Sequence, residues 1–239
     1  MITLVVHPVV PAWLSALAWL AIAIGLICAV VVAWDVWRNP PSMRIMAVVW
    51  PLTMLYGGVA AAWFYVRYAR TAHDHGESAA AHRVSVATGT SHCGAGCSLG
   101  DLIAEFMVAA IPTLAVAVGW GSLYHERIFA TWIWDFVLAY LLGIAFQYFT
   151  IAPMRGGRVR DNLLAAVKAD TASILAWQVG MYAVMAVLQF WAFPALFGAA
   201  LDVTSPVFWF GMQWAMVAGF ASAYPMTALL IRKGVKEAM

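Results

Sequence analysis

Residues 12–34 read AWLSALAWLAIAIGLICAVVVAW, an apolar run without a charged side chain. A helix needs about 20 apolar residues to cross the hydrocarbon core of a bilayer, so this run is long enough to cross once. The rest of the chain has the same character: of its 239 residues, 64% are hydrophobic and 10% are charged, and the mean hydropathy is +0.85. Soluble domains carry about 25% charged residues, so the composition predicts an integral membrane protein.

Further apolar segments of this kind follow at residues 44–66, 99–120, 128–152, 164–193 and 206–231. Together with the first they predict an all-α polytopic membrane protein with about six transmembrane helices. The first segment lacks the positively charged flank and the cleavage site of a signal peptide, so we expect it to remain as a membrane helix. A polar stretch, residues 69–98, reads as a linker between a two-helix front part (1–68) and a four-helix back part (99–239).

The basic residues of the short loops predict the orientation, because arginine and lysine gather on the cytoplasmic side of a membrane. If six helices cross, one side of the membrane carries three such residues: Arg38, Arg44 and Arg127. The other side carries nine: Arg67, Arg70, Arg83, Arg155, Arg158, Arg160, Arg232, Lys233 and Lys236. This asymmetry predicts an inner-membrane protein with both termini in the cytoplasm.

The polar stretch ends in SHCGAGC, residues 91–97, where two cysteines stand close to a histidine. Ser98 and Asp101 match a helix-start pattern, a serine followed three residues later by an acid. We therefore expect a loop through Cys93 and a helix that begins at Ser98, with Cys97 at the positive end of the helix dipole. In a second geometry the helix extends back to residue 92, and Cys93, Cys97 and Asp101 share one face.

Both geometries bring the thiols of Cys93 and Cys97 together, and His92 adds an imidazole. Thiolate and imidazole ligands suit copper(I) and zinc(II), so the motif predicts a metal site with copper foremost. A dithiol that cycles with a disulfide, and an ordinary glycine-rich turn, stay open as alternatives. The upstream His73, His75 and His82 are weaker candidate ligands, since such a stretch is often a solvated loop.

Four acidic residues lie within or beside the predicted helices, where charged groups are costly and usually functional. Asp101 and Glu105 lie four residues apart on one helix face, and Asp135 and Asp170 lie on two other helices. We interpret all four as candidates for an ion or proton path, although Asp101 is equally suited to capping a helix. For the buried glutamines and for the paired methionines, we expect hydrogen-bonding and packing roles: Gln147, Gln178, Gln189, Gln213, Met181, Met185, Met212 and Met216.

Much of the chain resembles a bacterial family known only as domain of unknown function number 4396. WPLTMLYGG in the second apolar segment is similar to that family, and five later segments match it: SHCGAGCSLGDLIAE, DFVLAYLLGIAFQYFTIAPMRG, LLAAVKADTASILAWQVGMY, PVFWFGMQWAMVAGFASAYP and LIRKGVKEAM. The resemblance covers roughly residues 45–239, and it implies an inner-membrane helical protein. It brings no activity, substrate or cofactor, so the candidate site residues rest on chemistry alone.

These observations together predict a membrane protein that binds a soft metal ion at Cys93, Cys97 and His92 on its cytoplasmic side and moves the ion through the helices. A membrane thiol oxidoreductase or redox sensor is the first alternative, and a subunit or assembly factor of a membrane complex is the second. No catalytic motif occurs in the sequence. A net charge of +2 gives no reason to expect a nucleic-acid partner; the expected partners are the bilayer, a metal ion and a second copy or another membrane subunit.

Overall fold

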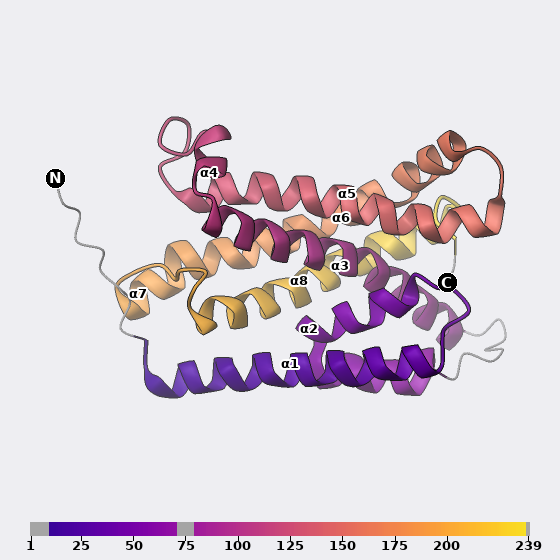
Figure 1. Ribbon diagram of the computed structural model, residues 1–239, viewed down its shortest axis with the longest axis horizontal. Coiled ribbons are helices and arrows are strands. Elements are labelled where there is room, and N and C mark those ends of the chain that lie inside the picture. Colours follow the sequence, from indigo (N-terminus) through magenta and orange to yellow (C-terminus); the bar gives the residue numbers. More distant parts are fainter. Residues whose placement is uncertain (1–9, 71–78, 238–239) are drawn as a thin grey trace.

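The computed structural model describes residues 10–70 and 79–237, and it is all-α (Figure 1). Its helices are α1 (Ala12–Arg38), α2 (Met46–Phe64), α3 (Ala79–Ala110), α4 (Thr113–Ala117), α5 (Arg127–Arg155), α6 (Val159–Val187), α7 (Phe193–Phe197) and α8 (Pro206–Arg232). Two π-helical turns, η1 (Tyr65–Ala69) and η2 (Leu188–Ala192), continue α2 and α6 without a break.

Six of these helical segments are long and apolar enough to cross a membrane, which confirms the predicted fold class. They are Ala12–Arg38, Met46–Ala69, Ala81–Ala110, Arg127–Arg155, Val159–Phe197 and Pro206–Arg232. Large apolar side chains point away from the bundle, such as Val30 (69% exposed), Trp191 (71%) and Leu196 (72%). Exposing so many large apolar side chains to water would be unfavourable, whereas contact with lipid is favourable. The chain is therefore a multi-pass membrane protein.

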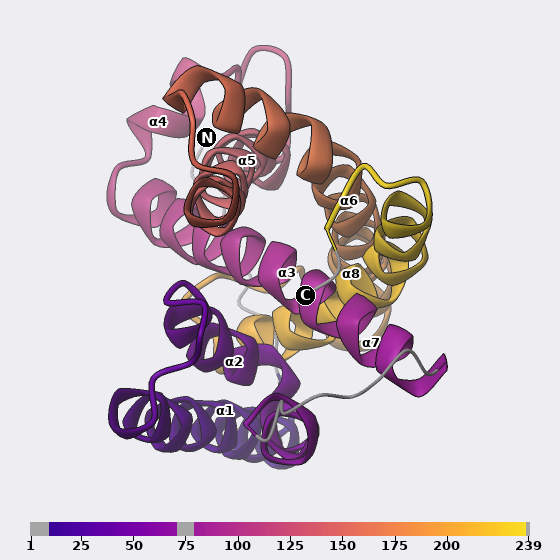
Figure 2. The ribbon, with the colours of Figure 1, turned by 90° about the vertical axis from the view of Figure 1, so that its right-hand side faces the viewer.

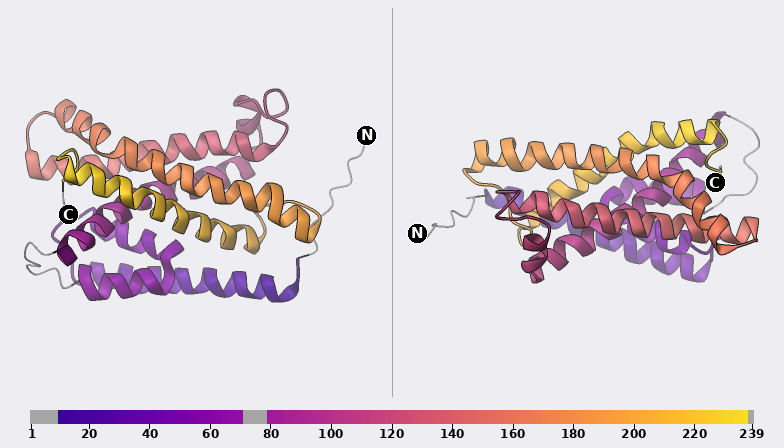
Figure 3. Two further views of the ribbon diagram at one scale, coloured as in Figure 1. Left: turned by 180° about the vertical axis from the view of Figure 1, so that it is seen from behind. Right: turned by 90° about the horizontal axis from the view of Figure 1, so that it is seen from above.

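The second apolar segment does not run straight, because it reverses at Gly58 (φ +49°, ψ −133°). In a straight helix Trp50 and Tyr65 would lie about 22 Å apart along the axis, yet their ring centroids are 5.5 Å apart. The hydroxyl of Tyr65 donates to Asp35 near the end of α1, at 2.8 Å. The two halves of α2 therefore form a hairpin that enters the bundle and returns to the end from which it came (Figures 1 and 3).

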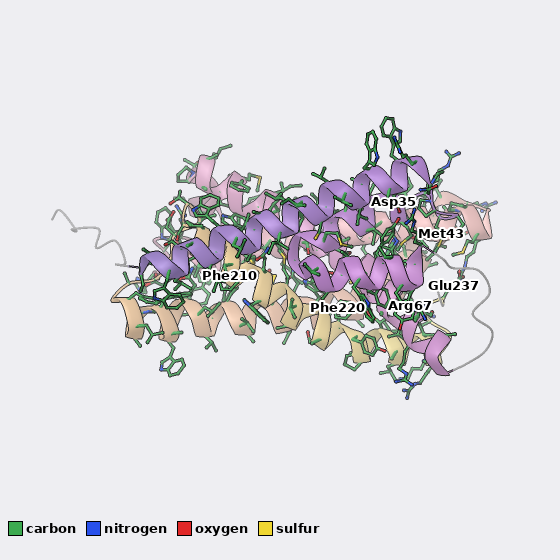
Figure 4. The ribbon with its side chains drawn as sticks, turned by 90° about the horizontal axis from the view of Figure 1, so that it is seen from below. Asp35, Met43, Arg67, Phe210, Phe220 and Glu237 are labelled. Atoms are coloured by element: carbon green, nitrogen blue, oxygen red, sulfur yellow. The ribbon has the colours of Figure 1, made fainter. Side chains whose placement is uncertain are left out.

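The hairpin decides where the two ends of the chain lie. Arg70, which follows η1, forms a 3.1 Å ion pair with Asp35, so residue 70 has returned to the end of the bundle where α1 finishes. Figure 4 shows Asp35, Met43, Arg67 and Glu237 at that same end, which we call the tail end. The opposite end, where α1, α5 and α8 begin, is the head end (Figure 1).

The start of α1 and the end of α8 thus lie at opposite ends of the bundle, whereas the sequence led us to expect both termini on one side of the membrane. Hydropathy detected the apolar segment at residues 44–66 but carried no sign of the reversal within it. The physical reason is local, since the Gly58 conformation is open to glycine and closed to residues with a Cβ atom.

Helix α3 lies at the centre of the bundle, between the α1–α2 pair and helices α5, α6 and α8 (Figure 2). It begins at Ala79, so the expectations of a loop over residues 91–97 and of a helix start at Ser98 are wrong. From residue 79 onward the predicted linker is helical. The expected third segment, residues 99–120, accordingly begins too late, since the apolar span found is Ala81–Ala110.

The glycines of SHCGAGC serve close packing rather than a turn. A Cβ atom on Gly96 would lie 2.7 Å from the Cα atom of Gly143 on α5. One helical turn later, a Cβ atom on Gly100 would lie within 3 Å of the backbone of Ala139. Small residues four apart on both helices let the two backbones approach directly, as in other membrane helix pairs.

Candidate functional site

Four chemically active side chains form one stripe along α3. Cys93, Cys97, Asp101 and Glu105 recur at intervals of four residues, and all four are buried. A helix places residues four apart on the same face with about 6 Å of rise between them, so the stripe is about 18 Å long. The second of the two predicted geometries is therefore the one that forms.

The two thiols lie near the middle of the membrane-spanning part of α3, and neither is exposed. Cys93 and Cys97 lie four residues apart on one face of α3, which makes their side chains neighbours. The expectation that Cys97 sits at the positive end of a helix dipole is wrong, because α3 begins several turns earlier. The expected position at the cytoplasmic surface is wrong for the same reason.

His92 points away from the thiols toward α5. Its Nε2 atom lies 2.8 Å from the Thr150 hydroxyl, and its ring stands 6.2 Å from that of Phe146. The Nδ1 atom is buried without a hydrogen-bond partner. In the described part of the chain, no group of three or more His, Cys, Asp or Glu side chains is arranged to hold a metal ion. The thiols thus stand as a pair, with His92 on a neighbouring face of α3.

Of the other histidine candidates, only His82 lies within the described residues, and it is far from this pair. His82 is exposed near the start of α3, about three turns before the thiols. His73 and His75 lie outside the described residues.

Three of the buried acids gather toward the head end. Asp101 accepts a hydrogen bond of 3.2 Å from Gln178, while its second oxygen has no partner. Asp135 on α5 is fully buried with both carboxylate oxygens unpartnered, and it is close enough to Glu105 and Asp101 to interact electrostatically. Ionised carboxylates are expensive in such surroundings, so these acids require protons or a bound cation.

A polar cavity of about 170 Å³ opens beside Glu105 at the head end. Arg127 and Asp202, which form an ion pair of 3.9 Å, line it together with Gln189. Glu105 is thus the point at which the buried stripe meets a space large enough for water or a hydrated ion.

Asp170 lies at the other end of the stripe, paired with a residue that sequence reasoning treated as an ordinary loop cation. The ammonium of Lys236 is 2.6 Å from an oxygen of Asp170, and both side chains have no exposed surface. Burial by itself lowers the pKa of Lys236, but the Asp170 carboxylate leads the opposing effects and the pKa lies above its ordinary value. The short contact and the complete burial of both side chains make Lys236 and Asp170 a buried ion pair. No signal in the sequence distinguishes it from its exposed neighbour Lys233.

Two of the four glutamines and all four paired methionines have structural roles. Gln189 exchanges two hydrogen bonds with the backbone of Leu201, and Gln213 donates to the carbonyl of Leu55 near the hairpin tip. Gln178 instead contacts Asp101 within the stripe, and Gln147 on α5 is buried with its side-chain oxygen unpartnered. The four methionines pack within the main hydrophobic core: Met181, Met185, Met212 and Met216.

Together, the fold and this site define the class of protein: a multi-pass helical membrane protein with a buried stripe of thiols and carboxylates. The model of a protein family described as a domain of unknown function, DUF4396, matches residues 83–236, and the chain belongs to this family. The matched region begins later than the resemblance at residue 45 suggested; it contains the whole stripe and Lys236, whereas α1 and the hairpin lie outside it. Comparisons with curated proteins and with solved structures give no match.

Proposed function

We propose that this protein binds copper(I) between the thiols of Cys93 and Cys97 and conducts it along the α3 stripe through the membrane. The observation that carries the proposal is the stripe itself, in which two soft ligands continue into a line of buried acids. Thiolates select copper(I), and copper(I) accepts two ligands in a linear arrangement. Zinc(II) takes four ligands in a tetrahedron, which the isolated thiol pair does not offer.

The acids give the cation a route toward the head end. Asp101 follows Cys97 by one turn, Glu105 follows by another, and Asp135 faces them from α5. A cation that leaves the thiols meets carboxylate oxygens that lack other partners. Protons released from these acids as the cation arrives would balance its charge, so transport is coupled to proton movement.

The thiol oxidoreductase alternative has less support. Thiol–disulfide exchange needs a partner thiolate to approach the sulfur atom in line. Both sulfurs belong to fully buried residues in the middle of a membrane-spanning helix, so such a partner has no access.

Replacing Asp135 by Asn tests the transport part of the proposal. The side chain keeps its size and loses its charge, so in proteoliposomes with a copper(I) gradient we expect uptake to fall at least tenfold. Metal bound at the thiols of purified protein should remain. Asp161→Asn, at an exposed position in the first turn of α6, is the matched control and should leave uptake unchanged. Normal uptake by Asp135→Asn would argue against the acids as the route.

The basic residues support an inner-membrane orientation with the tail end in the cytoplasm. The hairpin brings Arg38 and Arg44 to the same end as the other basic residues, which leaves Arg127 at the head end. Because basic residues mark the cytoplasmic side, the start of α1 should face the opposite side of the membrane.

Single cysteines in a Cys28→Ser background test this orientation. Ser42→Cys, between α1 and α2, should resist a membrane-impermeant maleimide in intact cells and react once the membrane is permeabilised. Ser122→Cys, at the head end, should react in intact cells. Both serines are exposed. An orientation in which α2 crosses fully predicts labelling of both positions in intact cells, so residue 42 decides between the two.

A further inference from the structure

The last described residues fold back into the bundle at the tail end of the stripe. After α8 the chain reverses at Gly234 (φ +64°), and the amide of Val235 donates to the Leu230 carbonyl at 3.0 Å. A 3.1 Å ion pair between Glu237 and Arg155 of α5 holds the segment from outside. The reversal turns the Lys236 side chain inward, while Lys233 remains exposed.

The Lys236 ammonium stands in line with the stripe. Besides Asp170 it contacts the carbonyl oxygen of Gly89, at 3.4 Å. Gly89 lies four residues before Cys93, so it is the next position of the same α3 face toward the tail end. The second oxygen of Asp170 has no partner, which leaves the carboxylate able to take another ligand.

A structural latch alone does not explain this arrangement well. A buried ion pair adds little net stability, because removing two charges from water costs about as much as their attraction returns. The outer ion pair of Glu237 and Arg155 also contacts the segment, but both side chains are exposed and such a pair contributes little. The distinctive feature of Lys236 is the positive charge that it places beside Asp170, at the tail end of the stripe.

We propose that Lys236 is a tethered cation that occupies a cation site at Asp170 and closes the stripe at the tail end. A monovalent cation such as copper(I) and the Lys236 ammonium exclude each other at this carboxylate. Entry or exit at the tail end then requires the segment from Gly234 to Glu237 to withdraw. The function of this closure depends on the proposed cation path along the stripe, but the closure itself can be measured without any metal.

The test is the rate at which Cys93 and Cys97 react with N-ethylmaleimide in the Cys28→Ser protein, followed by mass spectrometry. We expect slow alkylation in the parent protein and at least tenfold faster alkylation in Lys236→Met, which keeps the aliphatic stem and loses the charge. Lys233→Met is the matched control on the same segment and should alkylate at the parent rate. Equal rates for Lys236→Met and the parent, or a parent rate equal to that of unfolded protein, would overturn the proposal.

A second variant guards against misfolding caused by an unpaired buried carboxylate. Asp170→Asn/Lys236→Met removes both charges at once, and we expect it to alkylate as fast as Lys236→Met while retaining the parent's thermal unfolding. If this folded double variant alkylates at the parent rate, the closure is not electrostatic and the proposal fails. Copper(I) titration of the same proteins separates the two ideas: faster alkylation without copper binding would refute the proposed cargo and leave the closure standing.

Discussion

Protein purified without oxygen and titrated with copper(I) is expected to hold about one ion per chain, and the Cys93→Ser/Cys97→Ser variant is expected to hold none. The two thiols are neighbours on one face of α3, and His92 contacts Thr150 instead. The site thus depends on both sulfurs. Elemental mass spectrometry of the purified protein measures the metal directly.

The single variants sharpen this experiment. A site with two ligands has no other donor to replace a lost thiol. Cys93→Ser and Cys97→Ser should therefore each lower the affinity for copper(I) by more than about a hundredfold. Loss of a residue that merely supports a metal ligand already costs up to about that factor. Cys28→Ser is the matched control, since Cys28 lies on α1 among other side chains and should leave binding intact. His92→Ala should also bind normally, which separates the thiol pair from the three-ligand site that the sequence suggested.

Binding that survives in the double variant would refute the thiol site. An absence of metal in every protein, even after loading, would shift attention to the dithiol itself. Titration of the thiols under mild oxidation would then show whether Cys93 and Cys97 react as a redox pair.

The second large effect is expected from Gly100→Ala, a change of one methyl group. The new Cβ atom would stand 2.3 Å from the backbone nitrogen of Ala139 and 2.5 Å from its Cα atom. No rotamer change relieves a contact with backbone, so α3 and α5 would have to separate. Overpacking costs about 1–3 kcal/mol, and at the upper end the melting temperature should fall by roughly 10 °C.

Gly89→Ala is the matched control on the same helix, because its nearest neighbours would be side-chain atoms at 3.5 Å and 3.8 Å. It should unfold within a degree or two of the parent protein, since ordinary contacts of this kind cost little. Thermal unfolding in detergent, followed by circular dichroism, compares the two variants. Equal stability of Gly100→Ala and Gly89→Ala would mean that α3 and α5 are not packed backbone to backbone.

The sequence determined the parts of the fold that depend on single segments. Length and apolarity identified the six apolar segments, because the transfer of a segment into lipid is a property of that segment. They did not reveal that the second segment folds as a hairpin. The spacing of Cys93, Cys97, Asp101 and Glu105 already contained the stripe, once α3 is known to be helical there. The burial of Asp135 and Asp170 follows from their apolar surroundings in the chain.

Only the tertiary structure showed whether each glycine forms a turn or allows close packing between helices. Glycine permits a turn and also permits close helix contact, and local sequence does not distinguish these uses. The glycines of SHCGAGC were interpreted as a turn but pack against α5 and Trp177, whereas the turn itself lies at Gly58 within an apolar run. The pairing of Lys236 with Asp170 was equally hidden, because it joins residues on different elements and depends on where the bundle brings them. Hydropathy averages over residues that are adjacent in the sequence. The roles of these glycines and the Lys236–Asp170 pair depend instead on residues that are adjacent in space.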